Sequence, residues 1–271
     1  MISFPNAKIN IGLNVINKRA DGYHEIETVF VPIAIYDILE IVHGRGFSFN
    51  VSGLKIGGDI FDNLVVRAFD LMRKKFFLPL VNIHLHKSIP IGAGLGGGSS
   101  DAAFTIKLLN DIFELNLSTN KLLSLAEELC SDCPFFILNK PSFATGRGEK
   151  LTLIDLPLRG YTFVVIYPNI HISSAEAYKS VVPRMPENSL RELIKLPPTK
   201  WKDFVKNDFE LILFSKYPIL KKLKEALYSK GAIYASISGS GSSIYGIFSD
   251  DALPKDRNIM GFKYFIAKPI L

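Results

Sequence analysis

The sequence predicts an α+β fold arranged as two domains, and three observations support this prediction. Strand-like segments dominate the N-terminal part, helices and strands then mix without strict alternation, and residues 151–160 connect to a second half. With 271 residues and 48% hydrophobic composition, the chain can bury one large core or two ordinary ones. We therefore expect an N-terminal domain at residues 1–155 and a C-terminal domain at residues 156–271.

The N-terminal elements follow from periodicity and from local start signals. Strands are expected where apolar and β-branched residues alternate or cluster, at residues 9–14, 27–33, 38–42 and 81–86. Helices are expected where apolar residues recur at helical spacing, at residues 63–75, 99–113 and 119–130. Ser118 is a natural N-cap for the third of these helices. The first strands have no helix between them, so they predict an antiparallel start.

The C-terminal elements are predicted in the same way. A strongly β-prone run before Pro168 predicts a strand at 161–167, and shorter runs predict strands at 233–237 and 243–248 around S-G-S-G-S-S. Helical spacing predicts four helices, at residues 174–182, 189–195, 203–214 and 219–230. This order of elements again favours α+β over an alternating α/β fold.

A glycine-rich segment is the strongest functional signal in the chain. Residues Pro90 to Ala103 read P-I-G-A-G-L-G-G-G-S-S-D-A-A, with five glycines within seven residues and a predicted helix directly after them. Glycine lets the backbone approach a ligand closely, and the helix start offers unpaired N–H groups and a positive dipole end. A phosphate chain is the natural ligand, and a tightly turned surface loop is the structural alternative.

Two familiar phosphate-binding motifs do not fit this segment. A dinucleotide fold does not fit, because it needs a strand leading directly into the glycines and an acidic residue that ends a second strand about twenty residues later. Neither feature is present in this sequence. A Walker P-loop places Lys and Ser/Thr after its last glycine, whereas Ser99 and Ser100 follow Gly98 here. The loop has no lysine of its own, so a cation for a bound phosphate has to come from elsewhere, with Lys8 and Lys87 as candidates.

Composition favours an ordinary globular protein. The formal charge of +6 arises from 32 basic and 26 acidic residues that are spread along the chain, which suits small anionic ligands as readily as nucleic acid. The N-terminus lacks the apolar core of a signal peptide, so we expect a cytoplasmic protein without a membrane segment. The two cysteines, Cys130 and Cys133, have C-x-x-C spacing but follow a predicted helix, so we interpret them as incidental.

Several segments together resemble the GHMP kinases, a family that includes galactokinase, homoserine kinase and mevalonate kinase. The similarity is carried by the glycine loop and by six further segments that occur in the family's order: P-N-A-K-I-N-I-G-L at 5–13, R-A-D-G-Y-H at 19–24, N-L-V-V-R-A at 63–68, D-C-P-F-F at 132–136, N-D-F-E at 207–210 and I-S-G-S-G-S-S at 237–243. Seven segments in register over the whole chain are far more specific than one glycine motif.

The resemblance implies an ATP-binding N-terminal domain, a substrate-binding C-terminal domain and an active site in the cleft between them. The R-A-D-G-Y-H segment is similar to that of family members that phosphorylate the 2-hydroxyl of cytidine-diphosphate-linked methylerythritol on the non-mevalonate route to isoprenoids. Phosphoryl transfer needs an aligned acceptor, spread positive charge and often a carboxylate base. By resemblance Asp132 is that base, and Lys8 stabilises the transferred group and keeps Asp132 ionised. Asn10 lies on the same face of a strand as Lys8 and could orient the acceptor or the lysine.

The resemblance also assigns the nucleotide contacts. The glycine loop would wrap the triphosphate through these residues: Pro90, Gly92, Ala93, Gly94, Leu95, Gly96, Gly97, Gly98, Ser99 and Ser100. Asn63 and Lys87 match adenine-side contacts, although a helix cap for Asn63 and a solvated strand-end charge for Lys87 remain as alternatives. We expect Mg²⁺ to be held by the phosphates of ATP and by water, and no metal site made by protein side chains alone.

On the acceptor side, the resemblance points to Tyr23 and His24, with Phe30 and Tyr178 as aromatic surfaces for cytosine. Stacking on an aromatic ring contributes about 1 to 3 kcal/mol per base. His24 could read the pyrimidine edge through its ring or its backbone. For Phe30 and Tyr178, packing into the core is an equally good interpretation, because aromatic residues of strands and helices usually point inward.

Three other functions stay open at this stage. The chain could be a GHMP kinase for a different alcohol, an RNA-binding protein of related fold, or a relative that senses nucleotide without catalysis. Aromatic and basic residues are not interleaved as an RNA-binding platform would need. The set of Lys8, glycine loop and Asp132 suits an enzyme better than a binding module or a sensor. We therefore expect small-molecule substrates, no nucleic acid or membrane partner, and a monomer or homodimer.

Overall fold

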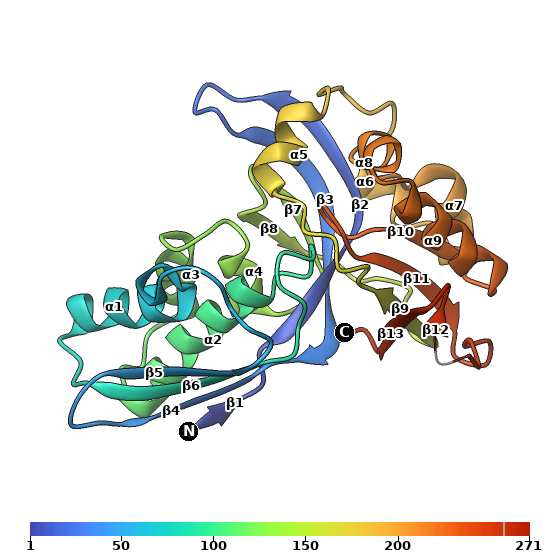
Figure 1. The fold of residues 1–271 in the computed structure, drawn as a ribbon. Coiled ribbons are helices and arrows are strands. Elements are labelled where there is room, and N and C mark those ends of the chain that lie inside the picture. Colours follow the sequence, from blue (N-terminus) through green and yellow to red (C-terminus); the bar gives the residue numbers. More distant parts are fainter. Residues whose placement is uncertain (257) are drawn as a thin grey trace. The chain divides into compact units, whose positions relative to one another are not determined.

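The structure is a computed structural model that describes residues 1–256 and 258–271 (Figure 1). Its elements are mixed helices and sheets, so the predicted α+β class is confirmed. The chain forms two compact units, each built from several segments. The first comprises Met1–Ala7, Ile35–Ile91 and Gly96–Asn139, and the second comprises Lys8–Ala34, Gly92–Leu95 and Lys140–Leu271.

The first unit contains a four-stranded sheet and four α-helices. The sheet has the order β1 (Ile2–Ser3), β4 (Ile38–His43), β6 (Val81–Lys87) and β5 (Ser48–Gly53), with only the β5–β6 pair parallel. The helices are α1 (Leu64–Phe76), α2 (Gly97–Ile112), α3 (Thr119–Glu127) and α4 (Cys133–Leu138), preceded by a short 3₁₀ turn, η1 (Ile60–Asp62). In β6 the buried positions alternate, and Lys87 falls on the buried face with Val81, Ile83 and Leu85.

Within its described residues, the second unit contains two antiparallel sheets and five α-helices. One sheet has the order β2 (Asn6–Lys18), β3 (His24–Tyr36), β7 (Ser142–Thr145) and β8 (Lys150–Leu153). The other has the order β10 (Tyr234–Ile237), β11 (Ile244–Ser249), β9 (Tyr161–Ile166), β13 (Phe262–Ala267) and β12 (Asn258–Ile259). The helices are α5 (Ser174–Ser180), α6 (Leu190–Leu193), α7 (Trp201–Phe204), α8 (Glu210–Lys216) and α9 (Pro218–Ser229), with a 3₁₀ turn, η2 (Pro198–Lys200), before α7. Strands β9, β10 and β11 and helices α8 and α9 supply much of its buried apolar core.

One helix prediction is wrong in a way that bears on the site. The sequence predicts a single helix at 203–214, but the chain forms α7, a break at Val205–Phe209 and then α8. The break is stabilised by Asn207, whose Oδ1 accepts a hydrogen bond from the N–H of Phe209 at 3.0 Å. The Nδ2 group of Asn207 donates to the carbonyl oxygens of Ile237 at 3.0 Å and Gly239 at 2.8 Å. These partners lie about thirty residues along the chain, so local periodicity does not reveal them.

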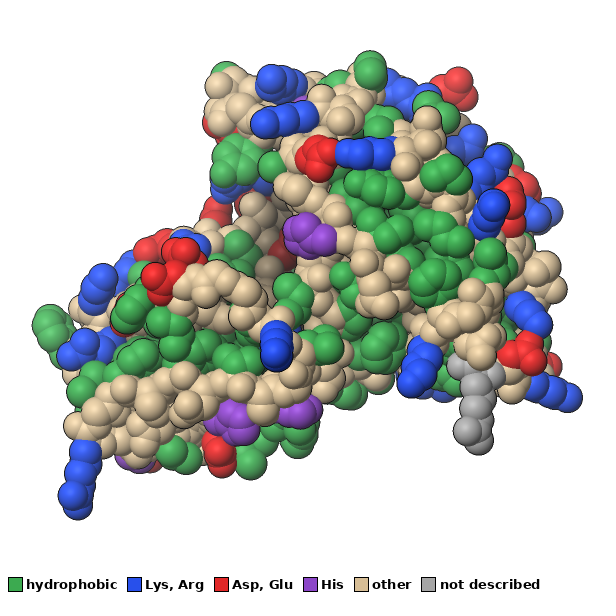
Figure 2. All heavy atoms as spheres, in the orientation of Figure 1, with side chains coloured by type: hydrophobic (Ala, Val, Ile, Leu, Met, Phe, Trp, Pro, Cys, Tyr) green, Lys and Arg blue, Asp and Glu red, His purple; other side chains and the backbone are tan. Residues whose placement is uncertain are grey.

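The surface and the helices add two observations. On the face drawn in Figure 2, the described lysine and arginine side chains are scattered among acidic and neutral ones, without a continuous basic stripe. Among the helices of the described residues, the longest apolar stretch falls short of what a bilayer crossing requires.

Candidate active site

The first half of the glycine loop is packed against a second glycine-containing loop in the same unit. Gly94 has φ +76°, and a Cβ atom there would lie 2.1 Å from the carbonyl oxygen of Ser238 and 3.0 Å from that of Gly241. The hydroxyl of Ser238 donates to the carbonyl oxygen of Gly94 at 2.8 Å. The backbone N–H of Lys8 donates to the carbonyl oxygen of Leu95 at 2.9 Å. Close backbone packing thus requires glycine at 94, and it joins the loop directly to the strand that carries Lys8.

The second half of the glycine loop begins helix α2 in the first unit. Gly96 is the N-cap at φ +70°, and no side chain caps the helix start. The N–H groups of the first helical turn therefore remain available for an anion. Among the described residues, the buried Ser100 Oγ and Asp101 Oδ1 atoms have no hydrogen-bond partner. Open N–H groups, a hydroxyl and a carboxylate oxygen without partners fit a nucleotide phosphate chain with its Mg²⁺ and bound water.

Lys8 and Asn10 form the polar centre of the second unit. Both lie on β2 two residues apart, and their side chains are 4% and 2% exposed. The Nζ atom of Lys8 donates to Asn10 Oδ1 at 2.5 Å and lies 4.9 Å from the centre of the Phe30 ring. Asn10 Nδ2 donates to the hydroxyl of Thr28 at 3.0 Å, which donates in turn to the carbonyl oxygen of Gly12 at 2.6 Å. The predicted shared face is confirmed, and Asn10 orients the ammonium group of Lys8.

The loop after β10 reaches this centre. The backbone N–H of Asn10 donates to Ser238 Oγ at 3.2 Å, and the hydroxyl of Tyr245 donates to the Asn10 carbonyl oxygen at 2.8 Å. A Cβ atom on Gly239, which has φ +57°, would lie 3.1 Å from Asn10 Oδ1 and 3.7 Å from Lys8 Nζ. The backbone of this loop therefore lies against the two polar side chains.

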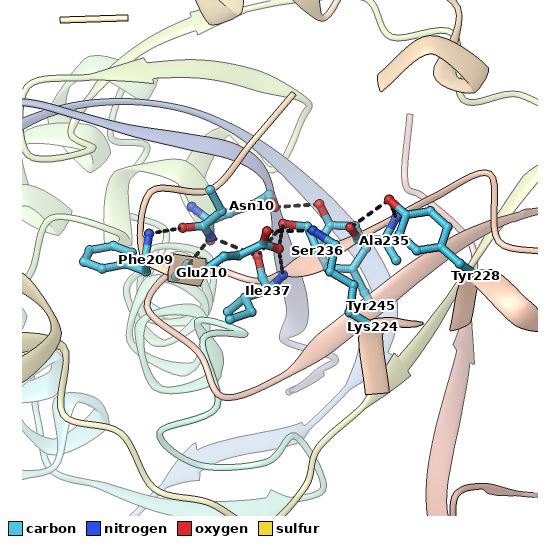
Figure 3. Close-up of polar contacts among 11 residues, drawn as sticks. Asn10, Phe209, Glu210, Lys224, Tyr228, Ala235, Ser236, Ile237 and Tyr245 are labelled. Carbon is cyan, nitrogen blue, oxygen red and sulfur yellow. Dashed lines mark hydrogen bonds and ion pairs between the residues drawn. The ribbon is translucent and has the colours of Figure 1, made fainter. Parts of the chain in front are cut away.

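Glu210 fixes the end of β10 that leads into the same loop (Figure 3). Its Oε1 atom accepts hydrogen bonds from the hydroxyl of Ser236 at 2.9 Å and the N–H of Ile237 at 3.2 Å. Its Oε2 atom forms an ion pair with Lys224 Nζ at 2.6 Å. Together with Asn207, Glu210 gives the N-D-F-E segment a physical role, which is to position the loop that contacts Lys8 and Asn10.

Lys87 lies inside a buried group of charges in the first unit. Its side chain is 3% exposed, and its Nζ atom contacts Asp37 Oδ2 and, at 2.8 Å, Asp101 Oδ2. Burial alone lowers the pKa of Lys87, but the two carboxylates outweigh it and raise that pKa. Burial raises the pKa of Asp101 to about 7, against the lowering effect of the Lys87 ammonium group. Lys87 is thus not a solvated strand-end charge, and it couples β6 to the helix that begins in the glycine loop.

Two further residues predicted for the site, Asn63 and Asp132, also lie in the first unit. Asn63 is the N-cap of α1, and its Oδ1 atom accepts a hydrogen bond from Val65 N–H at 2.9 Å, as the alternative interpretation required. Asp132 is the residue before α4 and adopts φ −85° and ψ −15°. Cys130 and Cys133 flank it, and Cys130 Sγ donates to Ser99 Oγ at 3.2 Å. The region of Asp132 is therefore linked to the start of α2.

The R-A-D-G-Y-H segment forms the turn between β2 and β3 in the second unit. Arg19 binds Asp21 at 3.0 Å and Glu25 at 3.0 Å, which orders the turn. Tyr23 is half exposed, and the Arg147 guanidinium group lies 4.9 Å from the centre of its ring.

The aromatic residues of this region differ in accessibility. The His24 ring stacks on Tyr178, with centroids 5.2 Å apart and planes 22° apart. Burial, with a smaller effect from Lys18, lowers the pKa of His24 below its usual value. Phe30 is 2% exposed, so it packs in the core beside Lys8 as the alternative interpretation stated. The structure thus brings His24 and Tyr178 together and leaves Tyr23 accessible.

Three residues of the site were not predicted from the sequence: Thr28, Asp37 and Glu210. Each is polar and lies on or beside an apolar element, which is the signal that could have marked Thr28 and Asp37 as buried partners. Glu210 belongs to a segment that contributed to the resemblance, but its hydrogen bonds to Ser236 and Ile237 depend on the tertiary fold.

The family models and the solved structures define the class of protein. The models for the N-terminal and C-terminal domains of GHMP kinases match residues 63–140 and 187–266. A crystal structure of mevalonate kinase superposes with a TM-score of 0.75 over 99% of both chains at 15% identity, which supports the shared fold. The class is that of a small-molecule kinase that uses ATP.

Individual relatives narrow the class. The 4-diphosphocytidyl-2-C-methyl-D-erythritol kinase of Bacteroides fragilis is 50% identical over 255 residues, covering 93% of each chain. That of Azobacteroides pseudotrichonymphae is 51% identical over 255 residues, covering 94% of this chain and 96% of its own. A crystal structure of 4-(cytidine 5'-diphospho)-2C-methyl-D-erythritol kinase superposes with a TM-score of 0.84 at 29% identity over 99% of both chains. This chain therefore belongs to the GHMP kinases and, within them, to the 4-diphosphocytidyl-2-C-methyl-D-erythritol kinase family, which confirms the resemblance predicted from the sequence.

Proposed function

We propose that this protein transfers the γ-phosphoryl group of ATP to the 2-hydroxyl of 4-diphosphocytidyl-2-C-methyl-D-erythritol, on the non-mevalonate route to isoprenoid precursors. The observation that carries the proposal is the buried Lys8, whose ammonium group is oriented by Asn10 and lies against the loop of Gly239, while its backbone N–H donates to Leu95 of the glycine loop. A preorganised cation with closely packed backbone around it suits the developing charge of phosphoryl transfer. The family membership supplies the reaction class and the acceptor.

In this proposal each half of the glycine loop has its own task. The start of α2 binds the phosphates through backbone N–H groups and through the hydroxyls of Ser99 and Ser100. The first half is joined to the surroundings of Lys8, because Gly94 accepts a hydrogen bond from Ser238 and Leu95 accepts one from the backbone N–H of Lys8. When bound, Mg²⁺ neutralises phosphate charge, and the carboxylate of Asp101 is the protein group that its water shell would meet.

Asp132 is proposed as the base that accepts the proton of the acceptor hydroxyl, and Lys8 as the group that stabilises the transferred phosphoryl. Asn10 is a positioning residue, since its side chain holds both Lys8 and Thr28. Lys87 is better assigned to positioning α2 than to direct contact with adenine, because its charge already faces two buried carboxylates. Asn63 caps α1 with its side chain, and its backbone N–H donates to the carbonyl oxygen of Ile60, so its contact with a nucleotide stays a prediction.

The acceptor's cytidyl group is proposed to bind beside the turn between β2 and β3. Tyr23 offers an accessible ring, and the adjacent Arg147 offers positive charge to the diphosphate. His24 and Tyr178 form a stacked pair that can present a flat surface and a ring nitrogen to the pyrimidine. Binding energy from this remote group can be used to align the reacting hydroxyl.

The cytoplasmic location, the absence of nucleic acid and membrane partners, and a monomeric or homodimeric state stay predictions. Cell fractionation, a filter-binding assay with RNA and sedimentation of the purified protein test them one at a time.

The function is tested by ADP release from purified protein with Mg²⁺ and ATP. The cytidyl substrate is compared with free methylerythritol, mevalonate, galactose and homoserine, and Lys8→Ala is the inactive control. Release with the cytidyl substrate alone supports the proposal. ADP release with a different alcohol would support kinase activity but exclude the proposed acceptor. No ADP release with any acceptor would favour a nucleotide sensor or an RNA-binding protein.

A further inference from the structure

The two cysteines lie in contact beside the phosphate-binding end of α2. Cys130 Sγ and Cys133 Sγ are 2.7 Å apart, and the N–H of Cys133 donates to the carbonyl oxygen of Cys130 at 3.2 Å. The turn between α3 and α4 therefore places the two sulfur atoms in contact. These are the chain's two cysteines, so each has one intramolecular partner for a disulfide.

The environment gives the two thiols unequal roles. Cys130 is half-buried, whereas Cys133 is buried. A hydrogen bond from Cys133 lowers the pKa of Cys130, assisted by Ser99 and opposed by burial. The same hydrogen bond, together with burial, raises the pKa of Cys133. Cys130 is thus the accessible nucleophile and Cys133 the internal resolving thiol, while a metal is a poor alternative because, within the described residues, no third Cys, His, Asp or Glu completes a site with them.

We propose that Cys130 and Cys133 form a reversible disulfide that lowers the turnover of the kinase. The thiolate of Cys130 attacks one sulfur of a small disulfide such as oxidised glutathione and releases the first thiol. Cys133 then attacks the Cys130 sulfur and releases the second thiol. The two cysteines lose two electrons, the small disulfide gains them, and the two protons leave with the released thiols.

The consequence follows from what lies around the pair. Oxidation removes the thiol proton that Cys130 donates to Ser99 at the start of α2. It also closes the segment Cys130–Cys133 into a ring that contains Asp132, the proposed base. Small displacements of a catalytic group reduce turnover strongly, so we expect the oxidised protein to be about five- to a hundredfold slower. This effect rests on the proposed function, whereas disulfide formation does not.

The test uses the purified full chain in glutathione buffers of increasing oxidised fraction. Intact mass and alkylation report the disulfide, a non-reducing gel excludes linkage between chains, and ADP release reports turnover. We expect the loss of two hydrogen masses, protection of both thiols from alkylation, slower ADP release and full recovery with dithiothreitol. Cys130→Ser is expected to remove the oxidant's effect on turnover, and Cys133→Ser is expected to stop at a mixed disulfide with glutathione.

Three results would overturn the proposal. Both thiols could stay alkylatable at the most oxidising ratio, the disulfide could form without a change in turnover, or Cys130→Ser could remain equally sensitive to oxidant. If the reduced protein is inactive with the cytidyl substrate, the proposed function fails, while mass and alkylation still decide whether the disulfide forms. Since those two measurements use the unmodified chain, poor folding of a cysteine variant leaves this part of the test intact.

Discussion

Alanine at Gly94 is expected to disrupt the site, while alanine at Gly98, four residues later, is expected to be tolerated by the fold. At Gly94 the new Cβ atom would lie 2.1 Å from the Ser238 carbonyl oxygen, so one of the two loops has to move by about 1 Å. Alanine at positive φ adds about 1 to 2 kcal/mol of strain. Gly98 lies inside α2, where a Cβ atom would meet only Leu64 at 3.9 Å.

The magnitude at Gly94 follows from the bonds that the displacement breaks. Ser238 donates to the carbonyl oxygen of Gly94 at 2.8 Å, and Gly241 N–H donates to that of Ser238 at 3.0 Å. Each bond contributes about 0.5 to 1.5 kcal/mol, so with strain we expect Gly94→Ala to lower the free energy of unfolding by about 2 to 5 kcal/mol. Gly98→Ala is expected to raise it by up to about 1 kcal/mol, because alanine is the better helix former.

Urea unfolding measures the two free energies, and ADP release measures turnover for variants that fold. Because the displaced loop borders Asn10 and Lys8, Gly94→Ala should also reduce turnover more than it weakens binding of an ATP analogue. Equal stabilities of Gly94→Ala and the unmodified chain would refute the reasoning, since the overlap would then have been relieved without breaking either bond. A Gly98→Ala variant as unstable as Gly94→Ala would refute it as well.

Three other substitutions test separate parts of the site. Lys87→Met should lower the free energy of unfolding by about 3 to 5 kcal/mol, because it leaves Asp37 and Asp101 buried without a counter-charge. The pKa of Asp101 is already raised to about 7, so the free energy of unfolding decreases as pH rises through that value. In urea titrations, the loss of unfolding free energy in Lys87→Met should therefore be larger near pH 8 than near pH 5. Asn207→Asp should lower the free energy of unfolding by about 2 to 5 kcal/mol in the same assay, since a carboxylate oxygen replaces the amide donor that faces two backbone carbonyl groups. A smaller loss than for Asn207→Ala would contradict the donor role of the Asn207 side chain. Asp132→Asn should keep the dissociation constant of an ATP analogue while lowering kcat by orders of magnitude, and near-normal kcat would remove Asp132 from the role of base.

Much of the fold was predictable because local patterns determine it. The alternation in β6 and the glycine-initiated α2 have signals within a few residues, and both elements occur close to the predicted positions. Strands such as β5 and β13 were not predicted, since their alternation is weak and their stability depends on neighbouring strands. The break between α7 and α8 was missed for the same reason, because Asn207 is held by carbonyl groups far along the chain.

The site shows the same division. The sequence indicated Lys8, Asn10 and the glycine loop through their spacing and residue types, and the structure brings Lys8 and Asn10 into hydrogen-bond contact. The environment of Lys87 was not predictable, because its partners Asp37 and Asp101 lie 50 and 14 residues away. Its residue type alone suggested that Lys87 contacts ligand or solvent. Because Lys87 is buried on the inner face of β6, it instead links β6 to α2.

The contacts around Lys8 indicate why glycine recurs in this chain beyond the needs of phosphate binding. Gly94 and Gly239 both have positive φ, and each brings a backbone segment to a place where a side chain would intrude on Ser238 or Asn10. An ammonium group surrounded by fixed backbone dipoles requires little reorganisation when negative charge develops nearby. Gly94 and Gly239 therefore shape the surroundings of Lys8, while the glycines at the start of α2 are proposed to bind the phosphates. Substitutions in the two sets should accordingly separate, with the first lowering turnover and the second weakening nucleotide binding.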